Sequence, residues 1–383
     1  MGEVRLKSFS RIKGFTFTII AQVLTLLILF GLAEGAFRLL NPDYDLRGRN
    51  ERGFFCVFDP VLGWAPKKQF TGIHEKNGFA IPVHQNQFGL RAPDSLLMEN
   101  PEGKRRIIVL GDSYVWGYGV DDNKVFTELG ESRYGAKLIN FGVSGYGTDQ
   151  EYLLYKGLGK NFVANEVILA ITPYNDFMNN TATRQYGYDK PYFLLVNDQL
   201  HLYTEHMELK SLKRFKNWLN DNLFAFNYIN AVVRNIKQIL ESSKKSASAP
   251  KQAVLQEGAV TDSDRAAMAL TIRIVDDLKK LVESQGRKFK VVFIPYKVHI
   301  NQSISHNHPM VPLFAEELQK IGVEYLEPFF TFRNRTEKGE GLFNQRDNHF
   351  STSGHALFAR ALLDPDLVKQ HRNYYHRDPA QKN

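Results

Sequence analysis

The chain has 383 residues, of which 43% are hydrophobic and 23% are charged, and its formal net charge is +8. These fractions are those of an ordinary globular protein and exclude a disordered chain. The length allows one large domain or two small ones. The positive charge is mild and no nucleic-acid-binding motif accompanies it, so we expect no nucleic-acid partner. The single cysteine, Cys56, excludes an internal disulfide, so a large core must stabilise the fold.

The N-terminus contains the first predicted element. Residues 14–33 include no charged side chain and are mostly apolar. Twenty residues in a helix extend about 30 Å, which is the thickness of the hydrocarbon core of a bilayer. We therefore predict a transmembrane helix over residues 14–36.

The flanking charges of this helix predict its orientation. The tail, residues 1–13, carries four basic residues, so the N-terminus is expected in the cytoplasm and the rest of the chain in the periplasm or at the outer face of the cell membrane. A cleaved signal peptide is the alternative. Its apolar region is usually only about 7–15 residues long, and the small-residue site at Ala33 is a poor cleavage site.

Residues 37–103 are rich in glycine, proline, asparagine and aromatic residues, and we predict a membrane-proximal, β-rich lead-in there. From residue 104 strands and helices alternate, which predicts a parallel sheet covered by helices. The predicted strands are 106–110, 137–141, 166–171, 288–296 and 323–328. The predicted helices lie near 123–134 and 149–157, from Ser263 to a cap at Gly286, over 313–321, and over 352–363 with Ser351 or Ser353 as the N-cap.

An insertion at about 177–262 interrupts this alternation, and residues 371–383 are predicted to be a tail. Within the insertion, residues 192–203 predict a hairpin that turns at Asn197 and Asp198. Residues 208–242 look helical and carry a basic patch, which we interpret as a solvated helix face. The patch consists of Lys210, Lys213, Arg214 and Lys216.

Four polar segments follow the predicted elements. Ser113 comes directly after the first strand, in Gly-Asp-Ser. Gly145 lies in a glycine-rich turn after the second strand, and Asn175 follows the third. Asp347 and His349 precede the last helix, two residues apart, where extended backbone points both side chains the same way. Each segment alone has an ordinary structural explanation, such as a helix cap or a turn, but reactive groups collect at the carboxyl edge of an open parallel sheet.

Taken together and in this order, the four segments resemble the SGNH hydrolase family, also called GDSL-type esterases and lipases. The resemblance runs from about residue 104 to 363, within a predicted hydrolase domain of residues 104–370. The earlier segments "FDPVLGWAPK" and "NQFGLRAPD", and the anchor ending in "AEGAFRLL", are similar to the membrane-anchored bacterial branch. It implies a three-layer α/β/α fold with a parallel, flavodoxin-like sheet. The namesake residues of the family correspond to Ser113, Gly145, Asn175 and His349.

The resemblance also implies roles for these residues. Ser113 would be the nucleophile, His349 the general base and acid, and Asp347 the group that orients the imidazole. The backbone N–H groups of Ser113 and Gly145 and the side chain of Asn175 would form the oxyanion hole. Two departures from the family pattern stand out. The commoner spacing is Asp-x-x-His rather than Asp-x-His, and the third segment reads Pro-Tyr-Asn-Asp.

Three tyrosines close to these segments suggest how a substrate is contacted. Tyr118, Tyr146 and Tyr174 each lie within a few residues of a different segment, and aromatic faces stack on sugar rings or line acyl pockets. Ordinary packing is the alternative for all three. A His-x-His pair, His306 and His308, can bind zinc, but no further ligand has suitable spacing, and we expect neither a metal nor a cofactor.

The predicted function is that of a membrane-anchored extracytoplasmic serine esterase. It would cleave or transfer O-acyl groups such as acetyl, on envelope carbohydrate, through an acyl-serine intermediate. A lipid or phospholipid esterase is the alternative within this class. A non-catalytic polysaccharide-binding or assembly protein on the same fold is the alternative outside it.

Overall fold

The computed structural model describes residues 2–41, 55–76, 79–173, 175–185, 188–204, 207, 211–230, 232–233, 236, 260–301, 308–345 and 347–375. The chain divides into two compact units. The main unit comprises Asn50–Leu209 and Val254–Asn383. The N-terminal unit comprises Met1–Arg49 and Lys210–Ala253, so it joins the start of the chain to part of the predicted insertion.

The centre of the main unit is a five-stranded sheet in which every strand pairing is parallel. The spatial order is β13-β12-β7-β5-β6, which is the 2-1-3-4-5 order of flavodoxin-like sheets. The winding direction therefore reverses between β5 and β7. The predicted fold class is confirmed. The strands are β5 (Arg105–Gly111), β6 (Ala136–Gly142), β7 (Glu166–Ile171), β12 (Lys288–Phe293) and β13 (Glu324–Leu326).

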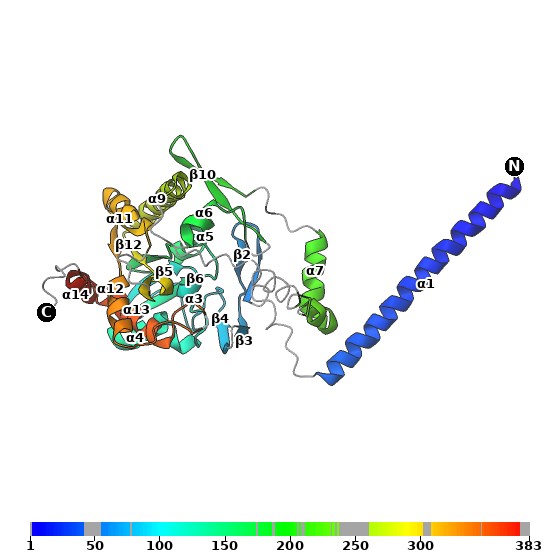
Figure 1. Cartoon of the computed structure of the whole chain (residues 1–383), viewed down its shortest axis with the longest axis horizontal. Coiled ribbons are helices and arrows are strands. Elements are labelled where there is room, and N and C mark those ends of the chain that lie inside the picture. The colour runs from blue at the N-terminus through cyan, green and yellow to red at the C-terminus, as the bar shows by residue number, and fades with distance from the viewer. Residues whose placement is uncertain are drawn as a thin grey trace. The chain divides into compact units, whose positions relative to one another are not determined.

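Helices cover both faces of this sheet (Figure 1). Successive strand residues point to opposite faces, so Ile108 and Leu110 join one hydrophobic cluster, while Ile107 and Val109 join the other. The first cluster is completed by residues of α5 (Thr148–Gly157), α9 (Asp262–Glu283) and α11 (Met310–Lys320). The second is completed by residues of α4 (Phe126–Tyr134), α12 (Phe329–Glu337) and α13 (Thr352–Leu363).

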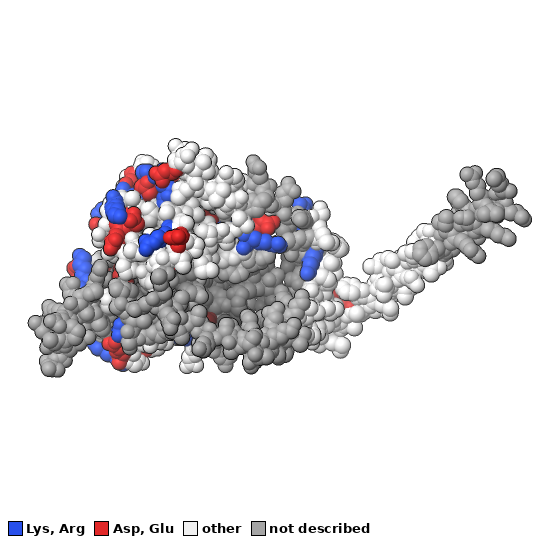
Figure 2. All heavy atoms as spheres, turned by 45° about the horizontal axis from the view of Figure 1, so that its top comes forward, with Lys and Arg blue, Asp and Glu red and all other residues white. Residues whose placement is uncertain are grey.

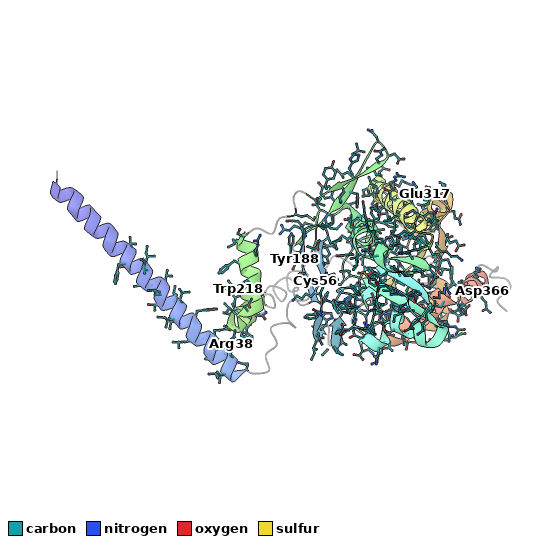
Figure 3. All side chains as sticks on the ribbon, turned by 180° about the vertical axis from the view of Figure 1, so that it is seen from behind. Arg38, Cys56, Tyr188, Trp218, Glu317 and Asp366 are labelled. Atoms are coloured by element: carbon teal, nitrogen blue, oxygen red, sulfur yellow. The ribbon has the colours of Figure 1, made fainter. Side chains whose placement is uncertain are left out.

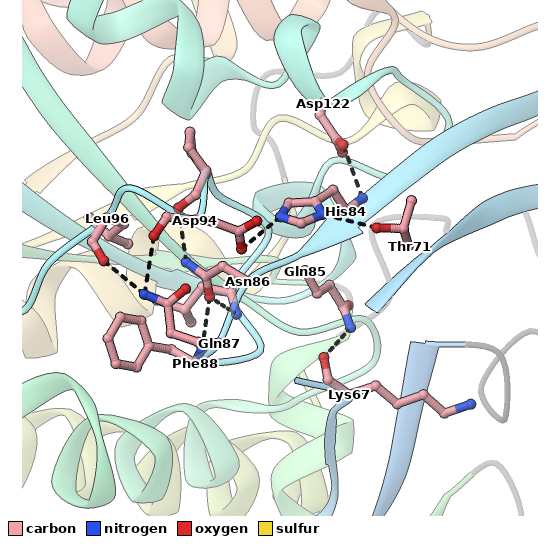
Figure 4. A network of polar contacts seen from close by, with 12 residues as sticks. Lys67, Thr71, His84, Gln85, Asn86, Gln87, Phe88, Asp94, Leu96 and Asp122 are labelled. Atoms are coloured by element: carbon pink, nitrogen blue, oxygen red, sulfur yellow. Dashed lines mark hydrogen bonds and ion pairs between the residues drawn. The ribbon is translucent and has the colours of Figure 1, made fainter. Parts of the chain in front are cut away.

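Residues 56–85 of the lead-in contain two hairpins that pack into the main unit. The first consists of β1 (Cys56–Asp59) and β2 (Gly63–Pro66), and the second of β3 (Phe70–Lys76) and β4 (Phe79–Gln85). Trp64 and Val83 are buried in the first hydrophobic cluster. Figure 4 shows how polar contacts fix the end of β4: the ring of His84 lies between Thr71 and Asp94.

The insertion begins with α6 (Asp176–Thr181) and continues as strands. β8 (Arg184–Gln185) pairs with β9 (Tyr188–Asp189), and β10 (Tyr192–Val196) pairs with β11 (Gln199–Tyr203). The hairpin predicted around Asn197 and Asp198 is confirmed, and both residues have the positive φ that the tightest hairpin turns require. After α6, the first part of the predicted helical insertion is thus largely β-structure within the main unit, and the next helix in the described residues is α7 (Ser211–Asn222).

The N-terminal unit contains α1 (Gly2–Leu40), α7 and a further helical stretch at 224–230. Thr16–Leu40 is long and apolar enough to cross a membrane. The described surface of α1 in Figure 2 is almost free of charged side chains, whereas acidic and basic residues are interspersed over the main unit. At the C-terminus, α14 (Pro365–Tyr375) extends into the segment predicted to be a tail.

Candidate active site at the carboxyl edge of the sheet

Ser113 lies where β5 ends and α3 (Ser113–Trp116) begins. Gly111 makes this sharp corner possible, because a Cβ atom there would lie 2.2 Å from Cγ2 of Val115. Asp112 caps the short helix, and its Oδ1 accepts the N–H of Tyr114 at 2.9 Å. Ser113 therefore occupies the carboxyl edge of the sheet beside the reversal between β5 and β7, which is where open α/β sheets bind ligands.

His349 lies 236 residues further along the chain and meets this serine. Its Nε2 is 2.7 Å from Oγ of Ser113. On the other side of the ring, Nδ1 is 3.3 Å from Oδ1 of Asp347, which also accepts the backbone N–H of His349 at 2.9 Å. The structure thus brings together the predicted serine, histidine and aspartate. A base within hydrogen-bond reach of a hydroxyl, and itself oriented by a carboxylate, is the arrangement that activates a serine nucleophile.

Side-chain tethers hold the segment that carries His349. The hydroxyl of Tyr114 donates to the carbonyl of Asn348 at 2.7 Å. Lys297, the first residue of α10 (Lys297–Asn301), donates to the carbonyl of Asp347 at 2.9 Å. The side chain of Asn348 donates to the hydroxyl of Tyr296 at 2.7 Å. None of these tethers is indicated by the sequence pattern, because each joins segments far apart in the chain.

The ring of Tyr118 contacts the imidazole directly. It stacks on His349 with the ring centroids 4.2 Å apart and the planes 24° from parallel. Only 4% of Tyr118 is exposed, and Phe79 packs edge-on against its ring. Tyr118 therefore supports the imidazole, and little of its surface remains for the predicted contact with a substrate.

The predicted oxyanion donors come from three strand ends. Gly145, after β6, has φ +81°, a conformation that side chains rarely allow. Within the described residues, no backbone hydrogen bond uses the N–H of Gly145 or of Ser113. Asn175 follows β7 and donates one N–H to Oδ2 of Asp112 at 3.3 Å. Because a side-chain amide has two hydrogens, this bond orients Asn175 and leaves its second N–H for a ligand.

The turn that carries Gly145 rests on the lead-in. The hydroxyl of Tyr146 donates to the carbonyl of Trp64, and the indole N–H of Trp64 reaches the carbonyl of Ser144 at 3.4 Å. Tyr146 is completely buried, so its ring packs in the core and does not line the site as the tyrosine hypothesis expected. Tyr174, the third tyrosine of that hypothesis, lies outside the described residues.

A buried arginine from the lead-in fixes the segment after Ser113. The side chain of Arg91 is 1% exposed and forms an ion pair with Asp122. It also donates to the backbone carbonyls of Trp116, Gly117 and Val120. The sequence "NQFGLRAPD" contains this arginine, but nothing in its pattern indicated that it reaches the serine loop. The lead-in is therefore a structural part of the site.

Two buried carboxyl groups, Asp112 and Asp176, adjoin Ser113 and Asn175 in the chain. Burial raises the pKa of Asp112, although the N–H of Tyr114 and the charge of His349 oppose this shift. Burial and the nearby charge of Asp112 raise the pKa of Asp176 well above its usual value. The Oδ2 of Asp176 accepts the backbone N–H of Thr172 at 2.6 Å. Burial thus favours the neutral form of both carboxyl groups, and the charge of Asp112 further disfavours ionisation of Asp176.

The described residues contain no group of three or more His, Cys, Asp or Glu side chains that could hold a metal ion. Within the predicted His-x-His pair, His306 lies outside the described residues. Burial lowers the pKa of His308 to about 4, and His299, whose ring centroid is 5.7 Å away, has the same shift for the same reason. These rings pack as neutral groups near neutral pH.

No protein-family model and no curated protein matches this sequence. Among solved structures, the chain is similar to a member of the lipolytic protein G-D-S-L family from Veillonella parvula, with 13% identity and a TM-score of 0.36 over 67% of this chain and 96% of that one. It is also similar to the acetyl xylan esterase AlAXEase, with 11% identity and a TM-score of 0.38 over 68% and 98%. A third is the esterase EstA from Pseudoalteromonas, with 11% identity and a TM-score of 0.37 over 70% and 99%. At these identities and TM-scores the similarity by itself assigns no function to this chain.

Proposed function

We propose that this chain is a serine esterase of the SGNH type that forms an acyl-enzyme on Ser113. One observation carries the proposal: Nε2 of His349 lies 2.7 Å from Oγ of Ser113 at the reversal point of the sheet. The 3.3 Å contact between Nδ1 of His349 and Asp347 supports a role for Asp347 despite the Asp-x-His spacing. Although only one residue separates them, the same carboxylate oxygen of Asp347 contacts both the backbone N–H and the Nδ1 atom of His349.

The proposed reaction has two halves. Oγ of Ser113 attacks the ester carbonyl while Nε2 of His349 takes its proton. The N–H groups of Ser113, Gly145 and Asn175 then stabilise the oxyanion, and the alcohol leaves with the proton from His349. In the second half, water attacks the acyl-serine by the same proton path and releases the acid. A sugar hydroxyl that replaced this water would make the reaction an acyl transfer.

The proposed substrate is an O-acyl ester, acetyl in the first instance, on envelope carbohydrate. The support for this choice is the apolar helix Thr16–Leu40 and the basic tail before it, which together favour an anchored protein whose main unit lies outside the cytoplasm. A panel of acetyl and long-chain esters tests the acyl group. Preference for long chains would replace this substrate with a lipid ester and leave the proposed chemistry intact.

Labelling by a fluorophosphonate tests the chemistry itself, since this reagent bonds covalently only to an activated serine. We expect the full chain in detergent to be labelled and Ser113→Ala to remain unlabelled. Turnover of an acetyl ester should fall by about 10⁴-fold or more, the usual loss when such a nucleophile is removed.

The matched control is Ser284→Ala, which removes a serine hydroxyl that donates only to a helix carbonyl on the exposed end of α9. This variant should be labelled as strongly as the unmodified chain. Equal labelling of Ser113→Ala and the unmodified chain would exclude Ser113 as the nucleophile. Absence of labelling in both chains would favour a non-catalytic role for the fold.

A further inference from the structure

Helix α7 in the N-terminal unit exposes large apolar side chains on one face. Leu212 is 80% exposed, Phe215 is 55% exposed and Trp218 is 53% exposed. With 100° between successive residues, these three and Leu219 lie within an arc of about 120°. The rings of Phe215 and Trp218 are nearly parallel, with centroids 6.2 Å apart, so they form a continuous aromatic surface.

Basic residues border this apolar face on both sides. By helical position, Lys216 lies next to Leu212 on one side, and Arg214 lies next to Trp218 on the other. A narrow apolar face bordered by lysine and arginine is typical of helices that lie in the plane of a membrane surface. There the long basic side chains reach the headgroups while the rings enter the acyl boundary.

Contacts within the N-terminal unit join this region to the end of α1. The Glu34 carboxylate accepts the backbone N–H groups of Phe224 and Ala225, each at 2.8 Å, at the start of the helical stretch 224–230. Arg38 forms an ion pair with Glu34 at 2.7 Å and donates to the carbonyl of Asn222, the last residue of α7, at 2.9 Å. Figure 3 labels Arg38 on α1 and Trp218 on α7.

The position of these contacts along α1 sets their depth in a membrane. The charge-free stretch 14–33 extends about 30 Å as a helix, which matches the hydrocarbon core. Glu34 is the first charged residue after this stretch, so it falls at the boundary between hydrocarbon and headgroups. The end of α7 is therefore held at the level at which an interfacial helix lies.

We propose that α7 is an interfacial helix that inserts its aromatic face beside α1 and binds anionic lipid headgroups through its basic border. The proposal rests on the membrane anchor of the proposed function but not on its esterase chemistry. A lipid surface is the occupant because a candidate membrane span is hydrogen-bonded to the same helical region, and because the basic border complements anionic headgroups.

Tryptophan fluorescence gives a direct test. The chain has three tryptophans, and Trp64 and Trp116 are at most 1% exposed, so Trp218 supplies the quenchable signal. The full chain is reconstituted into phosphatidylcholine vesicles with and without phosphatidylglycerol. We expect Trp218 to be quenched by lipids brominated near the glycerol end of the acyl chain, more strongly with phosphatidylglycerol present, and to be shielded from aqueous acrylamide. Trp218→Phe should remove this signal.

Charge reversal separates binding to headgroups from simple proximity. The double variant Arg214→Glu, Lys216→Glu should lower the equilibrium constant for insertion by about tenfold or more in phosphatidylglycerol vesicles. The matched control reverses two exposed lysines of the main unit, Lys320→Glu and Lys369→Glu, and should leave the quenching unchanged.

Alkaline extraction of the vesicles distinguishes the possible failures. A chain that resists extraction while acrylamide reaches Trp218 freely would overturn this proposal alone. A chain that is extracted would overturn the anchor and this proposal with it. Equal quenching with and without phosphatidylglycerol would overturn the binding of anionic headgroups. Turnover of an acetyl ester, measured on the same samples, reports on the esterase chemistry independently of all three results.

Discussion

The two sides of the candidate site are built in different ways. On the serine side, Ser113, Gly145 and Asn175 lie two, three and four residues after the ends of β5, β6 and β7, so the paired backbone of the sheet sets where each of their loops begins. On the histidine side, Asp347 and His349 lie on an irregular segment before α13. Hydrogen bonds from distant side chains hold that segment in place.

This difference predicts how each side responds to mutation. A donor on the serine side is placed by the sheet, so its removal should cost chemistry and leave the structure intact. The histidine side depends on several separate contacts, each of which contributes only about 1 kcal/mol to stability. A single substitution there should therefore make the position of His349 slightly less well fixed and lower activity only modestly.

The largest effect concerns the serine side. Asn175→Ala removes a predicted oxyanion donor that Asp112 orients. We expect kcat for an acetyl ester to fall by about 10²–10³-fold, since one such donor lowers the barrier by about 3–4 kcal/mol. KM should change little, because the donor acts mainly in the transition state.

The control for this variant is Asn100→Ala, which removes an exposed amide that donates to the carbonyl of Lys104, away from the site. It should keep full activity, and both variants should unfold at the same urea concentration as the unmodified chain. A loss below tenfold for Asn175→Ala would mean that Asn175 is not an oxyanion donor.

The next effect concerns His355, which supports the histidine side from α13. Its ring packs edge-on against Phe350, the residue after His349. Burial, and then the charges of Arg91 and His349, lower the pKa of His355 to about 3. The unfolded chain binds this proton below about pH 6.5, whereas the folded chain does not until near pH 3, so stability falls as the pH falls through this window.

His355 alone should thus remove about 2 kcal/mol of stability between pH 7.5 and pH 5. The glutamine in His355→Gln does not titrate and keeps an acceptor for the backbone N–H of Phe126. The free energy of unfolding of this variant should therefore fall by about 2 kcal/mol less than that of the unmodified chain between pH 7.5 and pH 5. Urea unfolding in detergent, followed by tryptophan fluorescence, measures the stability of the chain with and without His355→Gln. Both proteins carry Trp218→Phe, so that only the two buried tryptophans report on unfolding. Identical pH profiles would show that His355 titrates normally in the fold.

The elements that the sequence predicted well are those with local determinants. Strand 166–171 and helix 352–363 have the predicted bounds, and Ser351 is the N-cap that the sequence offered. Apolar spacing, glycine and capping residues all act within a few positions of the chain. The β-hairpins of the lead-in were expected only as a β-rich region, because their pairing depends on contacts that spacing does not reveal.

The supports of the site were not predictable in this way. Arg91 reaches carbonyls 25 to 29 residues away, and Trp64 contacts Tyr146 across 82 residues. Tyr118 and Tyr146 were placed near the site correctly by their neighbours in the chain, but the direction of each ring is decided by packing. For Tyr118 and Tyr146, closeness to a reactive segment in the sequence thus predicted closeness to the site but not the burial of each ring.

The smallest effect tests a single tether on the histidine side. Tyr114→Phe keeps the ring that packs 4.9 Å from His349 and removes only the hydroxyl that donates to the carbonyl of Asn348. The loss of one such hydrogen bond, about 1 kcal/mol, should lower kcat for an acetyl ester about fivefold with little change in KM. Tyr325→Phe, which removes an exposed hydroxyl that accepts from Gln319 on α11, is the control and should be fully active. An unchanged kcat in Tyr114→Phe would mean that the remaining contacts fix His349 without this hydrogen bond. The histidine side would then be as insensitive to the loss of a single tether as a segment that the sheet holds in place.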